Sequence, residues 1–257
     1  MEDAKRPIGV FDSGVGGISV LRALVSLMPN ENYIYFGDSL HAPYGSKRLQ
    51  EVRALTEQHV THLLEAGAKA IVVACNTATS ADISILRARY PHIPMIGIEP
   101  AVKPAVLSKE HPKVLVLGTP MTIHQEKFAR LLEKYEGSAK IYTQPCPGLV
   151  EYVERGELTG TGIEQFLRKL LAPYIEEKVD AAVLGCTHYP FVAEMIQKIL
   201  GDQVALYEGG PGTARETKRR LAQGNLLNPS KEEGVVRFEN SDLTPEKLRL
   251  CQFLLHV

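Results

Sequence analysis

The chain has 257 residues, of which 44% are hydrophobic and 23% are charged. This composition is typical of a globular protein and is sufficient for one large domain or two modest ones. A net charge of −1 gives no electrostatic reason to expect nucleic acid or an anionic membrane as the main partner. The densest basic run, Lys218-Arg219-Arg220, is interpreted as a solvated helix face rather than a phosphate site.

The start of the chain favours a cytoplasmic protein. Residues 1–7 are polar and mixed in charge, without the apolar core of a signal peptide. No stretch approaches the ~20 apolar residues that a membrane span requires. In the cytoplasm thiols are kept reduced, so the four cysteines are expected to be free for chemistry: Cys75, Cys146, Cys186 and Cys251.

Apolar runs alternate with helical patterns in the first hundred residues. Helices are predicted over residues 18–27 and 47–66, and strands over residues 8–11, 33–36, 70–74 and 95–98. The run 70–74 is apolar throughout, as expected of a strand that is buried on both faces of a parallel sheet.

The pattern then restarts. Strands are predicted over residues 113–117, 139–142, 181–184 and 204–207, and helices over residues 123–135, 163–175 and 192–200. Such alternation predicts α/β layers with parallel sheets. Two Pro- or Gly-rich breaks, 99–104 and 208–212, predict two crossings between domains. We therefore expect a first domain of residues 1–98 plus 211–257 and a second domain of residues 99–210.

One internal correspondence stands out. Residues 71–77 resemble residues 182–188, because each segment reads as a buried strand, a small residue, a cysteine and a hydrogen-bonding pair. Ligands of open α/β sheets bind beyond the carboxyl ends of the strands, where Cys75, Cys186, Asp12 and Asp38 all fall. The expected fold is therefore two pseudo-symmetric α/β domains, each a mostly parallel sheet flanked by helices, with the active site in the cleft between them.

Two opposed thiols suit a reaction that removes a proton from one face of a carbon and returns a proton to the other. The ordinary pKa of cysteine, about 8.5, lies close to working pH, and nearby charges or helix N-termini change it. Asp12 and His188 are in position to tune Cys75 and Cys186. A carbanion formed without a cofactor needs hydrogen-bond donors around the substrate carboxylate. Candidate donors are Ser13, Asn76, Thr77 and Thr187.

Four segments resemble the signature segments of the glutamate racemases, a branch of the aspartate/glutamate racemase family. They are Asp12-Ser13-Gly14-Val15-Gly16-Gly17, Pro43-Tyr44-Gly45, Cys75-Asn76-Thr77-Ala78 and Cys186-Thr187-His188-Tyr189-Pro190. Their order and spacing match, and the resemblance covers essentially the whole chain. It implies an isomerase that needs neither cofactor nor metal, interconverts L- and D-glutamate for peptidoglycan synthesis, and forms a homodimer.

The resemblance also implies residue roles. Cys75 would take the proton from D-glutamate and Cys186 from L-glutamate, with Asp12 and His188 assisting them. The substrate would be held by Ser13, Tyr44, Gly45, Asn76, Thr77 and Thr187, and Asp38 and Glu154 match acidic positions of family sites. The chain departs from the family at residues 207–212, which concerns hinge geometry rather than chemistry.

The sequence alone does not exclude other functions. Aspartate racemases resemble this scaffold but tend to carry an acidic residue where this chain has His188. A zinc hydrolase could use Cys75, Cys186 and His188, although no paired set of closely spaced ligands is present. A non-catalytic two-lobed binding protein would not need matched cysteines. The Gly14–Gly17 run lacks the full dinucleotide spacing and a Walker lysine, which disfavours nucleotide binding, and Cys146 and Cys251 are interpreted as core residues.

Overall fold

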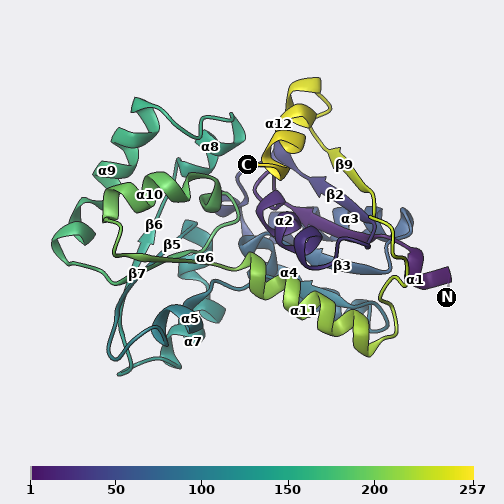
Figure 1. The fold of residues 1–257 in the computed structure, drawn as a ribbon, viewed down its shortest axis with the longest axis horizontal. Helices are drawn as coiled ribbons and strands as arrows, with labels where there is room; N and C mark the ends of the chain where they lie inside the picture. The colour runs from purple at the N-terminus through teal and green to yellow at the C-terminus, as the bar shows by residue number, and fades with distance from the viewer. Residues whose placement is uncertain (1) are drawn as a thin grey trace.

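The computed structural model describes residues 2–257, apart from the side chain of Lys127. The described chain forms two lobes side by side, each built on one sheet (Figure 1). The strand orders are β4-β3-β1-β2-β9 and β6-β5-β7-β8, and every strand pair in both sheets is parallel. The predicted α/β class with two parallel sheets flanked by helices is confirmed.

The first sheet is apolar on both faces. Its strands are β1 (Ile8–Asp12), β2 (Tyr33–Gly37), β3 (Ala70–Val73), β4 (Met95–Gly97) and β9 (Val236–Asn240). Successive side chains of a strand point to opposite faces, so Ile8 and Val10 pack in one core cluster while Phe11 packs in another. The accompanying helices are α1 (Glu2–Lys5), α2 (Ile18–Leu27), α3 (Leu49–Glu65), α4 (Asn76–Arg89), α11 (Gly210–Gln223) and α12 (Pro245–Leu255), with short 3₁₀ turns η1 (Ser39–His41) and η2 (Tyr44–Ser46).

The second sheet repeats this plan. Its strands are β5 (Lys113–Gly118), β6 (Lys140–Pro145), β7 (Ala181–Leu184) and β8 (Ala205–Glu208). Its helices are α5 (Val102–Val106), α6 (Pro120–His124), α7 (Glu126–Glu133), α8 (Leu149–Glu154), α9 (Thr161–Glu176) and α10 (Ala193–Leu200), with the 3₁₀ turn η3 (Tyr189–Val192).

The two sheets correspond strand by strand. The order β2-β1-β3-β4 in the first matches β6-β5-β7-β8 in the second. Cys75 comes two residues after β3, and Cys186 comes two residues after β7. The internal correspondence seen in the sequence is therefore a correspondence of equivalent strands, and it puts the two cysteines at equivalent ends.

One sequence prediction is wrong in detail. The single helix expected over residues 123–135 is two helices, α6 and α7, because the backbone of Gln125 is extended (φ −74°, ψ 138°) and its carbonyl starts a new helix. The segment 208–212, predicted as a crossing between domains, includes the start of α11 at Gly210. Pro211 fits the first turn of α11, where its missing N–H is not needed.

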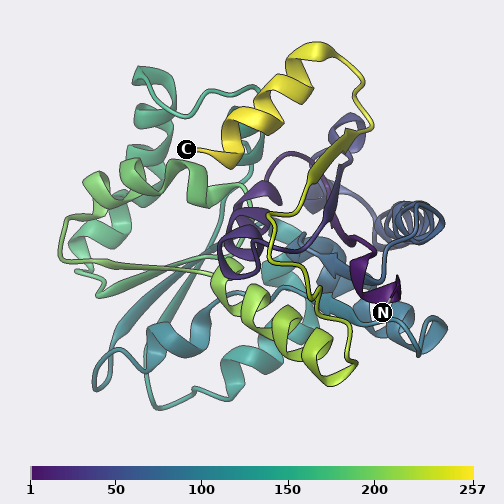
Figure 2. The ribbon, with the colours of Figure 1, turned by 45° about the vertical axis from the view of Figure 1, so that its right-hand side comes forward.

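Beyond residue 207 the sequence predicted only a solvated helix face at Lys218-Arg219-Arg220, which lies exposed on α11, and this part of the chain covers the first lobe. Helix α11 packs along α2, β9 pairs with β2, and α12 contacts both α2 and β9 (Figure 2). The domain boundaries at residues 98/99 and 210/211 stay a prediction. Within residues 2–257, no helix is both long enough and apolar enough to span a membrane.

Candidate active site

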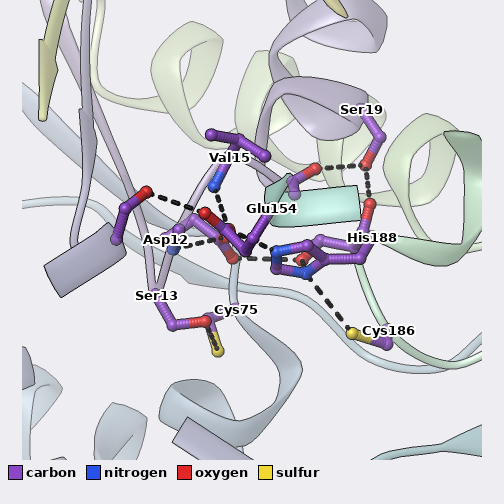
Figure 3. A network of polar contacts seen from close by, with 12 residues as sticks. Asp12, Ser13, Val15, Ser19, Cys75, Glu154, Cys186 and His188 are labelled. Atoms are coloured by element: carbon purple, nitrogen blue, oxygen red, sulfur yellow. Dashed lines mark hydrogen bonds and ion pairs between the residues drawn. The ribbon is translucent and has the colours of Figure 1, made fainter. Parts of the chain in front are cut away.

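The carboxyl ends of β1, β3 and β7 meet between the two lobes. Asp12 is the last residue of β1, Cys75 precedes α4, and Cys186 follows β7. Both sulfur atoms are buried, since Cys75 is 4% exposed and Cys186 is 6% exposed. Figure 3 shows these three residues in one network with Ser13, Glu154 and His188. The structure thus brings together the residues to which the sequence assigned the proton transfers.

Cys75 is held as the N-cap of α4. Its sulfur accepts a hydrogen bond from the Ala78 amide at 3.4 Å, and its thiol donates to Ser13 Oγ at 3.4 Å. Burial, reinforced by the negative charge of Asp12, raises the pKa of Cys75 to about 12. In this arrangement Cys75 therefore carries its proton at neutral pH.

Cys186 faces a histidine instead of a hydroxyl. Its sulfur lies 3.7 Å from His188 Nδ1, and His188 Nε2 lies 2.8 Å from Glu154 Oε1. Burial opposes a charge on His188, but the contacts with Cys186 and Glu154 outweigh it and raise the histidine pKa well above its ordinary value. Burial likewise opposes the charge of Glu154, yet His188 and Lys247 lower the pKa of Glu154 to about 2. His188 and Glu154 therefore form a buried imidazolium–carboxylate pair.

Asp12 joins the lobes rather than bonding to Cys75. Its Oδ2 accepts from the Gly14 amide at 3.1 Å, and its Oδ1 accepts from the Thr187 hydroxyl at 3.1 Å. Burial raises the pKa of Asp12, although His188 and the Gly17 amide act in the opposite direction. The direct hydrogen-bond partner of Cys75 is Ser13, a residue expected to hold substrate, and Asp12 acts on Cys75 through its charge.

The glycine run after β1 exists for close packing between the lobes. A Cβ atom at Gly14 would overlap the Glu154 carboxylate, and a Cβ atom at Gly16 would overlap the His188 ring. The Val15 amide donates to Glu154 Oε1 at 2.7 Å. The Val15 amide and the backbone of Gly14 and Gly16 therefore face Glu154 and His188 of the other lobe. This close packing explains the glycines without a phosphate ligand.

Tyr44 is oriented by a second buried carboxylate. Its hydroxyl donates to Asp38 Oδ2 at 2.7 Å, while His41 Nδ1 lies 2.7 Å from Oδ1 and His59 Nε2 lies 3.0 Å from Oδ2. Burial opposes the charge of Asp38, but these three groups lower its pKa. The ligating atoms of Asp38, His41 and His59 lie within 4.8 Å of one another, so this trio is a candidate for holding a cation. Because both carboxylate oxygens already accept hydrogen bonds, we interpret the trio as the support of Tyr44.

The remaining predicted substrate residues also lie at the interface of the lobes. Thr77 Oγ1 lies 3.0 Å from Thr119 Oγ1, and a Cβ atom at Gly45 would press on the side chain of Thr119. Asn76 is buried at the start of α4, and its Oδ1 has no hydrogen-bond partner among the described residues. A buried acceptor without a partner is costly, so Asn76 is in position to bind a ligand donor.

Similarity to known proteins identifies the family of this chain. The family model for Asp/Glu/hydantoin racemases matches residues 8–217. A glutamate racemase of Clostridium perfringens is 50% identical over 251 residues, which cover 98% of this chain and 96% of that protein. The chain belongs to the aspartate/glutamate racemase family.

Solved structures from this racemase family resemble the whole molecule. Glutamate racemase of Francisella tularensis in complex with D-glutamate superposes with a TM-score of 0.85 at 31% identity, covering 99% of this chain and 95% of that one. Escherichia coli glutamate racemase in complex with L-glutamate and the activator UDP-MurNAc-ala gives a TM-score of 0.85 at 29% identity, covering 97% and 95%.

Two members of this racemase site were missed in the sequence. Thr119 caps α6 and contacts Thr77, and Lys247 on α12 bonds to Glu154. Lys247 lies outside the residues that the family model matches. A signal for α12 was present, because Thr244 followed by Pro245 and Glu246 is a typical helix start. The other two cysteines, Cys146 and Cys251, are buried and free, as predicted.

Proposed function

We propose that this chain is a cofactor-independent glutamate racemase in which Cys75 and Cys186 are the two acid–base groups. The observation that carries the proposal is their position after equivalent strands of two facing sheets. The similar proteins described above support this proposal. One of them is 50% identical to this chain, and two were solved in complex with D- or L-glutamate.

The two thiols differ in a way that suits the reaction of L-glutamate. A protonated imidazole beside a sulfur stabilises a thiolate, so Cys186 next to His188 starts as the base. It takes the α-proton, forming an S–H bond, and the electron pair left on the α-carbon spreads into the carboxylate. The Cys75 thiol then donates its proton to the opposite face of the carbon and becomes the thiolate. The product D-glutamate leaves the enzyme with the opposite assignment of protons, which solvent restores.

Substrate binding draws on groups that this closed site leaves available. The Asn76 Oδ1 acceptor fits the α-ammonium group, which is a hydrogen-bond donor. The amides of Asn76 and Thr77, at the start of α4, have no partner within the helix and fit the α-carboxylate, where they would stabilise the charge of the carbanion. Ser13, Tyr44, Thr77, Thr187 and the backbone at Gly45 would complete the contacts.

Substrate entry requires the lobes to part. Both cysteines are nearly inaccessible, since Cys75 is 4% exposed and Cys186 is 6% exposed. We infer that the described arrangement is the closed state, in which water is excluded from the reacting carbon.

Two other functions fit the observations less well. An aspartate racemase would use the same chemistry on a substrate shorter by one methylene, but the half-identical relative is a glutamate racemase. A two-lobed binding protein would not require a thiol at 3.7 Å from an imidazole that is itself oriented by a carboxylate.

Circular dichroism of purified protein with L-glutamate, and separately with L-aspartate, tests the substrate. We expect the glutamate signal to decay to zero without added cofactor and the aspartate signal to stay constant. Decay of aspartate alone would make the chain an aspartate racemase, and decay of neither would favour the binding protein.

We also propose three further properties, the first from the sequence and the other two from the family resemblance. They are a cytoplasmic location, a homodimeric state, and the supply of D-glutamate for peptidoglycan. Sedimentation of the purified protein tests the dimer, and growth of a depleted strain with and without D-glutamate tests the supply role.

A further inference from the structure

Lys247 reaches the acid–base network from the C-terminal helix. Its ammonium donates to Glu154 Oε2 at 3.0 Å and to the Glu154 backbone carbonyl at 2.7 Å. The side chain of Lys247 is 12% exposed and that of Glu154 is 11% exposed, so water does not replace this contact. Helix α12 lies against the first lobe while α8 belongs to the second, so the bond also crosses the cleft (Figure 1).

Glu154 is the junction of this network (Figure 3). Its Oε1 accepts from the Val15 amide and from His188 Nε2, and its Oε2 accepts from the Ser39 hydroxyl and from Lys247. With four donors on two oxygens the carboxylate has one orientation. That orientation determines where the imidazole of His188 lies relative to the sulfur of Cys186.

We propose that Lys247 is a positioning residue of the racemisation site: its ammonium fixes the Glu154 carboxylate, which holds the His188 imidazole beside Cys186. The inference rests on the proposed function and deepens it. It makes α12, which lies beyond the family-model match, part of the acid–base machinery. Closure of the lobes then assembles the Cys186 side of the site, because Lys247, Val15 and Ser39 reach Glu154 only when the lobes meet.

The Lys247 ammonium also affects how strongly Glu154 and His188 bind their protons. A positive charge beside Glu154 weakens proton binding at Glu154 and at its partner His188, so its removal strengthens proton binding at both. The other titratable groups whose charges act on this pair are Asp12, Tyr35, Cys186, Asp242 and Cys251. The Lys247 charge also acts on Asp242 and Cys251, so a shift is assigned to the Glu154–His188 pair by observing the ring of His188 itself.

The test compares wild type, Lys247→Met, Lys247→Arg and Arg249→Met. Arg249 is the matched control, since it lies on the same helix with a side chain 66% exposed and bonds only to Glu246 among the described residues. We expect Lys247→Met to lower kcat roughly 10- to 100-fold for both enantiomers and to move the basic limb of the kcat/KM profile, where His188 loses its proton, up by about one pH unit. Lys247→Arg should recover most of the activity, and Arg249→Met should match wild type. Lys247→Gln replaces Lys247→Met should the latter not fold.

A double variant distinguishes a positioning role of Lys247 from a contribution to stability alone. In the Glu154→Gln background we expect Lys247→Met to cause no further loss of kcat, because Lys247 acts through that carboxylate. An equal further loss, an unshifted pH profile, or wild-type kinetics of Lys247→Met would each overturn the inference.

A spectroscopic readout keeps the inference apart from the proposed function. The ¹⁵N signals of the His188 ring, assigned with His188→Gln, should titrate at higher pH in Lys247→Met than in wild type. Wild type that does not racemise glutamate would refute the proposed function, whereas an unchanged His188 titration would refute the role of Lys247.

Discussion

The Thr187 hydroxyl donates to Asp12 Oδ1 at 3.1 Å and thereby joins the end of β7 in one lobe to the end of β1 in the other. Beside it, Ser19 Oγ donates to the Thr187 carbonyl at 2.9 Å, and the Val15 amide donates to Glu154. The polar contacts that close the lobes are thus the same contacts that orient the acid–base groups. If the lobes part to admit substrate, as we propose, the same movement breaks the contacts that orient these groups.

Thr187→Val tests this bond at nearly constant volume. The variant leaves Asp12 Oδ1 without its donor, so we expect unfolding to become easier by about 1–2 kcal/mol and kcat/KM to fall roughly tenfold. Thr217→Val is the matched control, because its buried hydroxyl bonds only within α11, to the Thr213 carbonyl. Urea unfolding measures the stability of both variants, and steady-state kinetics measure their kcat/KM. Equal kcat/KM for Thr187→Val and Thr217→Val would argue against a role of the Thr187–Asp12 bond in catalysis.

Gly16→Ala tests the close approach of the lobes. The added methyl group would overlap the His188 ring, so the ring or the lobe must shift. We expect a loss of stability of about 1–3 kcal/mol and at least a tenfold loss of kcat. Gly212→Ala is the control, since its new methyl group would meet only Arg215, at 4.0 Å. Retained activity in Gly16→Ala would contradict the tight packing of His188 against this glycine.

Glu154 contributes stability that depends on pH. Its pKa of about 2 in the folded protein lies below the ordinary 4.5, so the contribution is present above pH 4.5 and is lost as pH falls toward 2. The stability advantage of wild type over Glu154→Gln should therefore shrink by about 3 kcal/mol across that window. Urea unfolding between pH 2.5 and 7 measures the advantage. Glu246→Gln, at an exposed ion pair, should show a small and flat difference, and a flat difference for Glu154→Gln would count against the buried pair.

A second buried ion pair is structural and lies away from the site. Lys69 Nζ donates to Glu31 Oε2 and to the Ala4 carbonyl, both at 2.5 Å, and ties the N-terminal helix to the first lobe. Lys69→Met leaves Glu31 buried without its cation, so we expect a loss of about 3–5 kcal/mol with unchanged kcat/KM. Lys109→Met, which removes an exposed pair with Asp180, should cost under about 1 kcal/mol. Thermal unfolding and kinetics check both, and a drop in kcat/KM for folded Lys69→Met would contradict a purely structural role.

Local sequence patterns predicted the fold well where they repeat. The buried strands β3 and β7 and the cysteines that follow them are visible as two matching segments, and this match predicted two facing lobes. The break between α6 and α7 was not predictable from apolar spacing, because it depends on the extended backbone of Gln125. The bounds of α11, β9 and α12 were not predicted, and their partners in the first lobe lie about two hundred residues earlier in the chain.

The site was predicted by residue type and motif, while its connections needed the structure. Asp12, Cys75, Cys186 and His188 lie together as expected. No spacing rule could show that Ser13 bonds to Cys75, or that Asp12 bonds to Thr187 of the other lobe. The Ser13–Cys75 bond depends on the pairing of β1 with β3, and the Asp12–Thr187 bond depends on two sheets that face each other.

The most direct test of the two-thiol account is racemisation of L-glutamate in deuterium oxide by wild type, Cys75→Ala and Cys186→Ala. Thiol protons exchange with solvent, so two opposed thiols predict that early D-glutamate carries α-deuterium while the remaining L-glutamate keeps its proton. Each single variant should lose racemisation by at least about a thousandfold. Early product that retains the substrate proton, or either variant racemising within tenfold of wild type, would contradict the account.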